Sequence, residues 1–169
     1  MQKNVFLCFS LLTIAFIITV GCGGDQRPDG LPPTYPLTIK VVQEGKPMEG
    51  ATVSLRFTDG SMNWIIGGVT NAEGKAKIVT HGKYEGAPEG SFNVTVDKTV
   101  QEGKAEYDAA IERGDTAAAQ KIEVNVWQLV EDDYLLSSKT PIKIEVKKDT
   151  KELEVDAGKA VKIKKDFLK

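Results

Sequence analysis

Residues 45–53 of this chain read GKPMEGATV, and they predict a tight turn that leads directly into a buried strand. Gly45 can adopt the positive φ that such a turn needs, and the ring of Pro47 holds φ near about −65°. Gly50 closes the turn, and Ala51 is small where the chain would enter the core. Beyond Ala51 apolar and polar side chains alternate, which is the pattern of a half-buried strand.

Similar alternating stretches lie on both sides of this segment. They cover residues 37–42, 51–57, 76–80, 92–96, 142–146 and 153–155, and residues 161–163 could add a short last strand. Turn-forming residues separate them at 59–61, 71–74 and 148–151, and glycines make residues 81–90 a predicted loop. Strands that recur at this spacing predict a mainly β fold, an antiparallel sandwich.

Residues 100–121 interrupt the strand pattern and predict a helical insert at about 100–130. One helical face would carry Val100, Lys104, Tyr107 and Ile111. Gly114 is placed just after the end of this helix, and Asp115 is placed as the N-cap of a second helix. Residues 122–126 fit either a helix or a strand, and we favour a helix that continues to about Val130.

Three short motifs resemble the signatures of carboxypeptidase-regulatory-like and transthyretin-like sandwich domains. Residues 45–53 are similar to the signature G-x-P-x-x-G-A-x-V. Residues 70–76 (TNAEGKA) resemble T-[DN]-x-x-G, with Asn71 and Gly74 at the turn positions. Residues 90–96 (GSFNVTV) resemble the third signature, in which a glycine, here Gly90, precedes an aromatic and alternating strand. The three motifs occur in the expected order over about fifty residues.

The resemblance implies an Ig-like or transthyretin-like sandwich with a helical insert before the last strands. It also implies an accessory, adhesive or structural role on an exported protein. The signatures specify turns and carry no catalytic residue. Transthyretin-like hydrolases use several histidines, whereas this chain has one, so we expect neither that activity nor a cofactor.

The N-terminal segment predicts export and lipidation. Residues 5–20 are uncharged and apolar, and they are shorter than the roughly 20 residues that span a bilayer comfortably. Gly21 and Cys22 follow, a pattern that resembles the lipobox of bacterial lipoproteins, in which the cysteine becomes the first residue and carries lipid. We therefore expect residues 1–21 to be a signal peptide and Cys22 to be lipidated. An uncleaved anchor and an ordinary secretory signal are the alternatives.

Residues 22–36 are rich in glycine and proline, so they predict a flexible tether before a domain at 37–169. Removal of residues 1–21 would leave 148 of the 169 residues, enough for one domain with a core of its own. It would remove one lysine from 22 basic and 24 acidic residues, which leaves a net charge of about −3. Neither sign dominates, so nothing points to nucleic acid. Lipidated Cys22 would leave no thiol for a disulfide, a metal site or a nucleophile.

Few residues are candidates for a ligand site. His81 is the only histidine and lies in a predicted loop without metal-ligand spacing, so we expect a solvated side chain and no metal site. Trp64 stands beside two isoleucines and is expected in the core. Trp127 and Tyr134 are the aromatic residues that could face a ligand.

The sequence as a whole predicts a non-enzymatic protein of the cell envelope, anchored to a membrane by lipid, with a binding or structural role. One alternative is a carbohydrate-binding module that stacks aromatic side chains on a polysaccharide. Another is a docking subunit that binds an envelope protein through the insert, for which exposed apolar residues on the insert would be the sign. An enzyme ranks third and would need acidic residues together with His81 in one pocket.

Overall fold

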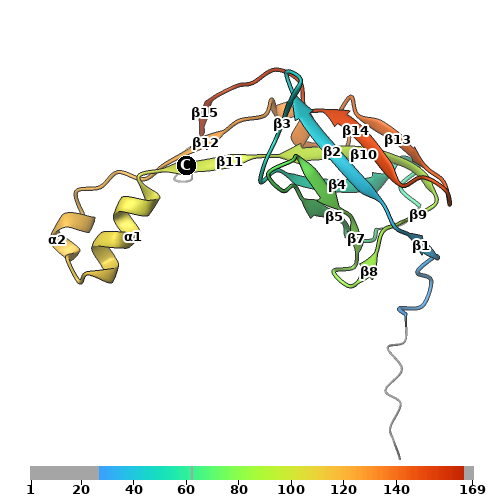
Figure 1. Ribbon diagram of the computed structural model, residues 1–169, viewed down its shortest axis with the longest axis horizontal. Helices are drawn as coiled ribbons and strands as arrows, with labels where there is room; N and C mark the ends of the chain where they lie inside the picture. The colour runs from blue at the N-terminus through green and yellow to red at the C-terminus, as the bar shows by residue number, and fades with distance from the viewer. Residues whose placement is uncertain (1–26, 62, 166–169) are drawn as a thin grey trace, which may run out of the picture. The chain divides into compact units, whose positions relative to one another are not determined.

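The alternating stretches form two β-sheets that enclose one hydrophobic core (Figure 1). The computed structural model describes residues 27–61 and 63–165, and the folded unit begins at Leu31. The predicted signal peptide and Cys22 lie outside the described residues. The mainly β sandwich predicted from the sequence is therefore confirmed.

The larger sheet has six strands. Their order is β13 (Lys143–Val146), β10 (Gly90–Asp97), β4 (Thr52–Phe57), β5 (Ile66–Val69), β7 (Val79–Thr80) and β8 (Tyr84–Glu85). All neighbours in this sheet are antiparallel.

The smaller sheet is built on β2 (Thr38–Gln43). Its other strands are β14 (Glu152–Asp156), β3 (Lys46–Pro47) and β6 (Lys75–Lys77). Strands β3 and β6 run antiparallel to β2, whereas β14 runs parallel to it. A separate short pair joins β1 (Thr34–Tyr35) to β9 (Ala87–Pro88).

The core lies between the two sheets because every second side chain of each strand points inward. The largest fully buried apolar side chains are Phe92, Ile39, Leu55, Ile78, Val41, Val53, Val94, Val96, Val130 and Val146. Trp64, expected in the core, is half-buried and packs against this cluster. Thus the predicted alternation correctly identifies the inward faces of β2, β4 and β10.

One stretch of chain serves both sheets. Strand β6 pairs with β2 in the smaller sheet, and two residues later β7 pairs with β5 in the larger sheet. Ile78 lies between them, fully buried, and its backbone N–H donates to the Leu37 carbonyl at 3.0 Å. The bend at Ile78 therefore closes one side of the sandwich.

Thr70 joins the first two motif loops. Its buried hydroxyl donates to the Met48 carbonyl at 2.6 Å and accepts from the Ala51 N–H at 2.7 Å. Its backbone N–H donates to the Ala51 carbonyl, and its carbonyl accepts from the Gly50 N–H, both at 2.9 Å. Four hydrogen bonds therefore connect the turn before β4 to the end of β5.

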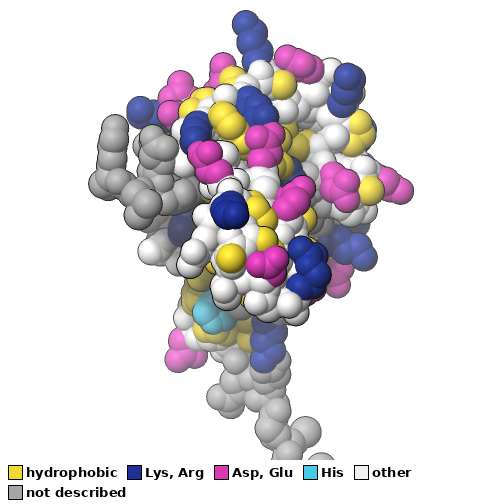
Figure 2. All heavy atoms as spheres, turned by 90° about the vertical axis from the view of Figure 1, so that its left-hand side faces the viewer, with side chains coloured by type: hydrophobic (Ala, Val, Ile, Leu, Met, Phe, Trp, Pro, Cys, Tyr) yellow, Lys and Arg dark blue, Asp and Glu magenta, His cyan; other side chains and the backbone are white. Residues whose placement is uncertain are grey.

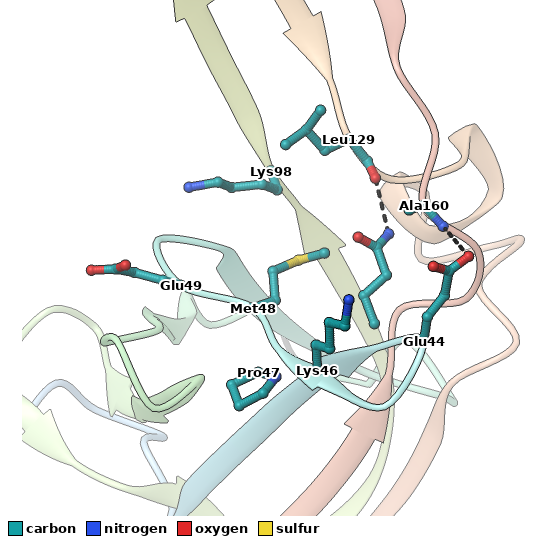
Figure 3. A pocket seen from close by; sticks show the side chains of 9 residues that line it. Glu44, Lys46, Pro47, Met48, Glu49, Lys98, Leu129 and Ala160 are labelled. Carbon is teal, nitrogen blue, oxygen red and sulfur yellow. Dashed lines mark hydrogen bonds between the residues drawn. The ribbon is translucent and has the colours of Figure 1, made fainter.

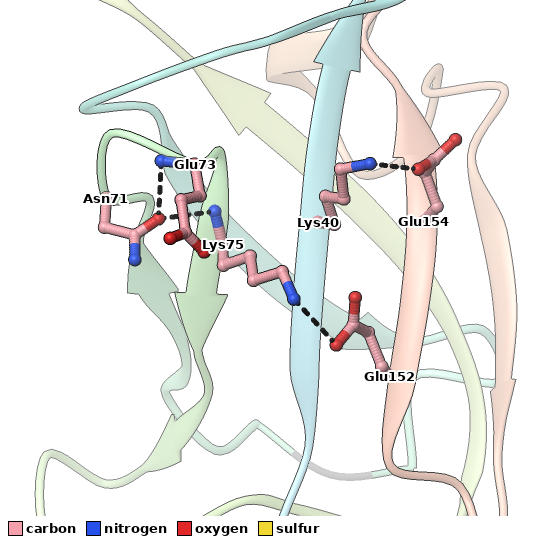
Figure 4. A network of polar contacts seen from close by, with 6 residues as sticks. All are labelled: Lys40, Asn71, Glu73, Lys75, Glu152 and Glu154. Carbon is pink, nitrogen blue, oxygen red and sulfur yellow. Dashed lines mark hydrogen bonds and ion pairs between the residues drawn. The ribbon is translucent and has the colours of Figure 1, made fainter.

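The turn after Thr70 depends on Asn71 and Gly74. The Asn71 Oδ1 accepts from the N–H groups of Glu73 and Lys75 at 3.0 and 2.9 Å (Figure 4). Gly74 has φ +74°, and a Cβ there would lie 2.6 Å from the Val41 carbonyl oxygen. Both the conformation and the lack of space require glycine at this turn.

Two further turns have consecutive residues with positive φ. Glu44 and Gly45 connect β2 to β3, and His81 and Gly82 connect β7 to β8. Positive φ at both central residues is the type I′ geometry that suits the twist of a hairpin. Residues 81–90, predicted as a loop, thus contain a hairpin turn and the short strands β8 and β9.

The helical insert stands at the end of a ribbon of strands. Strand β10 continues past Lys98 as β11 (Thr99–Glu102), which pairs with β12 (Asn125–Gln128), and β15 (Ile163–Lys165) pairs with β12. Between β11 and β12 lie α1 (Lys104–Glu112) and α2 (Thr116–Ala119), which Figure 1 shows away from the two sheets. We call residues 99–128 together with β15 the arm.

The predicted limits of the helices were wrong at both ends. Val100 is in strand β11, and the second helix ends at Ala119 instead of continuing to about Val130. Residues 125–128 form a strand because β11 and β15 flank β12 on both sides and supply the partners for its backbone. The predicted cap is correct: the Asp115 carboxylate accepts from the Ala118 N–H at 2.9 Å.

The predicted tether also extended too far. Leu31 is buried, and Thr34–Tyr35 pairs with β9, so residues 31–36 belong to the folded unit. The prolines in this segment do not prevent the short pairing, since Thr34 and Tyr35 lie between them. Two elements complete the description of the chain order. The 3₁₀ helix η1 (Asp132–Leu135) follows β12, and β15 follows β14.

Replacing Thr70 with valine tests the importance of its hydroxyl. The change leaves the Met48 carbonyl and the Ala51 N–H buried without a partner, so the free energy of unfolding should fall by about 2–4 kcal/mol. Urea unfolding of the two proteins measures the difference. The same substitution at exposed Thr52 is the control and should change stability by less than about 0.5 kcal/mol. Equal effects at the two positions would contradict this role of Thr70.

Candidate functional site

A cleft of about 350 Å³ lies where the arm leaves the sandwich (Figure 3). One wall comes from residues 43–49, which include the β2–β3 turn, and the other comes from Lys98, Leu129 and Ala160. Lys98 lies between β10 and β11, and Leu129 directly follows β12, so these two lining residues stand at the two ends of residues 99–128. The cleft therefore brings together four segments that are far apart in the sequence.

Hydrogen bonds hold the two walls of this cleft together. The Gln43 side-chain amide donates to the Leu129 carbonyl at 2.9 Å and to the Lys159 carbonyl at 3.1 Å. The Ala160 N–H donates to the Glu44 carboxylate at 3.3 Å, as Figure 3 shows. Residues of the β2–β3 turn thus fix the position of the chain at the root of the arm.

The side chains that line the cleft mix charge with apolar surface. Lys46 and Lys98 supply two ammonium groups, and Glu49 supplies a carboxylate besides that of Glu44. Met48, which is buried, provides apolar lining. The polar side chains among the residues that line this cleft are lysines, glutamates and one glutamine.

The arm carries apolar side chains that its own fold does not cover. Tyr107 is 36% exposed and Ile111 is 46% exposed, and they lie one helical turn apart on α1. Within the two helices only Ala110 and Ala119 are buried. On the side from which the arm projects, acidic and basic side chains alternate with hydrophobic ones, and neither charge dominates (Figure 2).

Trp127 lies in the ribbon of the arm, where charged side chains surround it. Its indole N–H donates to the Glu102 carboxylate at 2.7 Å, and the Lys162 ammonium lies 4.5 Å from the ring centroid. The hydrogen bond from Lys162, followed by that from Trp127, holds the pKa of Glu102 below its usual range. One side of the indole ring is therefore occupied by a cation.

Tyr134 lies in η1, and its ring packs against the core. Burial, followed by the charges of Glu131 and Asp156, raises the pKa of Tyr134. A Cβ at Gly158 would lie 2.5 Å from the Tyr134 hydroxyl, so a glycine is needed beside the ring. Trp127 and Tyr134, the predicted ligand-facing aromatics, thus belong to different elements, β12 and η1.

His81 is exposed in the turn between β7 and β8. Its ring meets the ring of Trp64 edge to face, with centroids 5.8 Å apart. Over residues 27–61 and 63–165, no three histidine, cysteine or acidic side chains are close enough to hold a metal ion. In the same ranges no helix is both long and apolar enough to cross a bilayer.

The outer face of the smaller sheet carries ion pairs. Lys40 on β2 contacts Glu154 on β14 at 2.8 Å, and Lys75 on β6 contacts Glu152 at 3.2 Å (Figure 4). Lys40 and Lys75 lie opposite each other in the β2–β6 ladder, where like charges repel. The two glutamates of β14 offset this repulsion, although exposed pairs contribute only about 0–1 kcal/mol each.

No family model, no curated protein and no solved structure matches this chain. The geometry of its own residues is therefore the basis for any functional conclusion.

The sequence did not reveal the cleft, because no local pattern connects residues 43–49 with residues 98, 129 and 160. The predicted motif residues Gly45, Pro47 and Gly50 are nevertheless at or beside it, since the first motif forms the β2–β3 turn. The pairing of β12 with β11 and β15 could not be predicted from the sequence, because residues 122–126 fit both the helical and the strand period of apolar residues.

The low pKa of Glu102 has a measurable consequence for Trp127. In a Trp64→Phe background, acidification should change the Trp127 fluorescence with a midpoint below the usual range of glutamate, because protonated Glu102 loses its pairing with Lys162. A Glu102→Gln variant should lose this transition. A midpoint at or above the usual range in the parent protein would contradict the pairing.

Proposed function

We propose that this chain is a non-enzymatic, lipid-anchored protein of the cell envelope whose arm docks onto another envelope protein. The observation that supports docking most directly is the exposed apolar pair Tyr107 and Ile111 on a helix that stands away from the core.

The energetics of the arm favour this role. A helix of nine residues is marginal in isolation, and α1 buries only Ala110. Burying the exposed parts of Tyr107 and Ile111 against a partner would contribute on the order of 1 kcal/mol or more for each side chain. Tyrosine is also among the residues that contribute most at the centres of protein interfaces.

The sandwich is then the support that positions the arm. Strand β11 continues β10, and the Gln43 and Glu44 hydrogen bonds fix the chain beside its root. A surface held in one orientation loses less conformational entropy on binding than a flexible one. The proposed partner would therefore bind a preorganised surface on the arm.

The proposed anchor is supported by the apolar segment before Gly21 and Cys22 and by the glycine-rich residues that precede Leu31. A lipid anchor would concentrate the protein at the membrane and so raise the effective concentration of the arm near envelope partners.

Replacing Cys22 with serine tests the anchor. The variant should no longer incorporate a labelled fatty acid and should leave the membrane fraction, because serine lacks the sulfur that carries the lipid. Metabolic labelling followed by fractionation measures both effects, and Cys8→Ser is the matched control. Unchanged labelling of the Cys22→Ser protein would refute the lipoprotein assignment.

Site-specific photocrosslinking tests the docking role of the arm. A photoreactive amino acid in place of Glu106, next to Tyr107, should give a discrete crosslinked product in isolated envelopes. The same amino acid in place of exposed Glu73, on a turn of the sandwich, should give none.

A second change makes the test specific to the apolar pair. Tyr107→Ser with Ile111→Ser should remove the product from position 106 and leave the melting temperature nearly unchanged, because both side chains are exposed. Glu112→Ser is the control on the same helix and should keep the product. A product that survives loss of both apolar side chains would contradict the proposal.

A further inference from the structure

A polar groove crosses the outer face of the larger sheet, away from the arm residues proposed for docking. It consists of two adjoining hollows, of about 510 and 280 Å³, which share Arg56 and Ser137. We call them together the Arg56 groove. Volumes of this order are typical of sites for small molecules.

The floor of the groove follows from the alternation of β4 and β10. Val53, Leu55 and Val94 point into the core, so the side chains between them point outward. Antiparallel pairing places Thr95 opposite Ser54 and Asn93 opposite Arg56. Two neighbouring strands therefore present a continuous polar floor.

Two segments form the walls. Gly60 and Asn63 belong to the connection between β4 and β5, and Leu135, Leu136 and Ser137 lie at the end of η1 and beyond it. Leu136 is 48% exposed and gives this wall an apolar surface. The groove thus has hydrogen-bonding groups on its floor and an apolar side.

Arg56 lies at the centre of the groove with its guanidinium oriented. One terminal nitrogen donates to the Asn63 Oδ1. This contact uses one terminal nitrogen, and the remaining N–H donors of the guanidinium form a fork that matches the two oxygens of a carboxylate. The Asn63 side-chain N–H₂ group lies on the same wall and can donate as well.

Charge in the groove has one sign. Among the residues that line the two hollows Arg56 is the only charged one, although the chain has 24 acidic residues. The nearby Asp59 accepts from the Ser61 N–H at 2.9 Å and does not line the hollows. The remaining polar lining is uncharged and includes the hydroxyls of Ser54, Thr95 and Ser137.

We propose that the Arg56 groove binds a polyhydroxylated carboxylate, the chemistry of a sugar acid, either free or within an acidic saccharide. Arg56 takes the carboxylate through paired N–H···O bonds, and the serine and threonine hydroxyls exchange hydrogen bonds with the ligand's hydroxyls. The C–H surface of the sugar ring lies against Leu135 and Leu136. The absence of a carboxylate from the lining favours an anionic ligand over a neutral sugar.

The binding test uses residues 23–169, which include the whole folded unit, labelled with ¹⁵N. Binding is measured by NMR. The ligands are galacturonate and a short oligogalacturonate, with galactose, acetate and inorganic phosphate as comparisons. We expect saturable shifts of the amides of Arg56, Thr95 and Ser137 with the two sugar acids. Galactose and acetate should bind at least about tenfold more weakly, because each lacks one half of the recognised chemistry.

Variants connect the binding to the groove. Arg56→Gln removes the charge and should weaken binding of the sugar acids at least about tenfold. Arg56→Lys keeps the charge without the fork of donors, so its affinity should lie between those of the parent protein and Arg56→Gln. Arg113→Gln, on the arm, is the matched control and should leave the affinity unchanged. The melting temperature of each variant shows whether the fold is intact.

Several outcomes would overturn the proposal. If galactose binds as tightly as the sugar acids, the groove does not recognise the carboxylate charge. If acetate or phosphate binds as tightly as the sugar acids, the groove does not recognise the hydroxyls of the ligand. Unchanged affinity in a folded Arg56→Gln variant, or no saturable shift at about 10 mM sugar acid, also refutes it. None of these results depends on residues 107 and 111, so docking by the arm is tested separately.

Discussion

The hydroxyl of Thr70 is the contact on which the rest of the sandwich depends. The hydroxyl accepts from the Ala51 N–H and donates to the Met48 carbonyl, which lie in the turn before β4. Both hydrogen bonds are buried, and a carbonyl or N–H left there without a partner would cost free energy. Because Thr70 directly follows β5, the same contact also bears on how β4 and β5 align. The alignment of β4 in turn decides which side chains of β4 and β10 enter the core and which form the Arg56 groove.

Much of this fold could be predicted from local patterns. Period-2 alternation identified β2, β4 and β10, and the side-chain chemistry of Asn71 and Asp115 identified a turn and a helix cap. The end of the second helix was missed because residues 122–126 satisfy both helical and strand periods. Only the neighbouring strands β11 and β15, distant in sequence, decide between them.

The surfaces with a proposed role were harder to predict. The cleft at the root of the arm joins residues from four segments, and the Arg56 groove joins β4, β10 and two connections. Ser54, Arg56 and Thr95 have the ordinary composition of a solvent-exposed strand face, so the sequence gives no sign of a site. These residues form a groove only because the walls beside them come from segments that are distant in sequence and that folding brings close. The parallel pairing of β14 with β2 was likewise invisible, since it rests on the whole topology and on the acidic residues of β14 facing Lys40 and Lys75.

The continuity of β10 and β11 also bears on how the molecule would respond to mechanical load. A pull on the tip of the arm would pass along the backbone of β11 directly into β10 of the larger sheet. There β10 is paired with β4 on one side and β13 on the other, so many hydrogen bonds would be loaded in shear together instead of breaking one after another. Tension between the proposed membrane anchor and the proposed partner at the arm would therefore reach the sandwich through a strand that is paired on both sides.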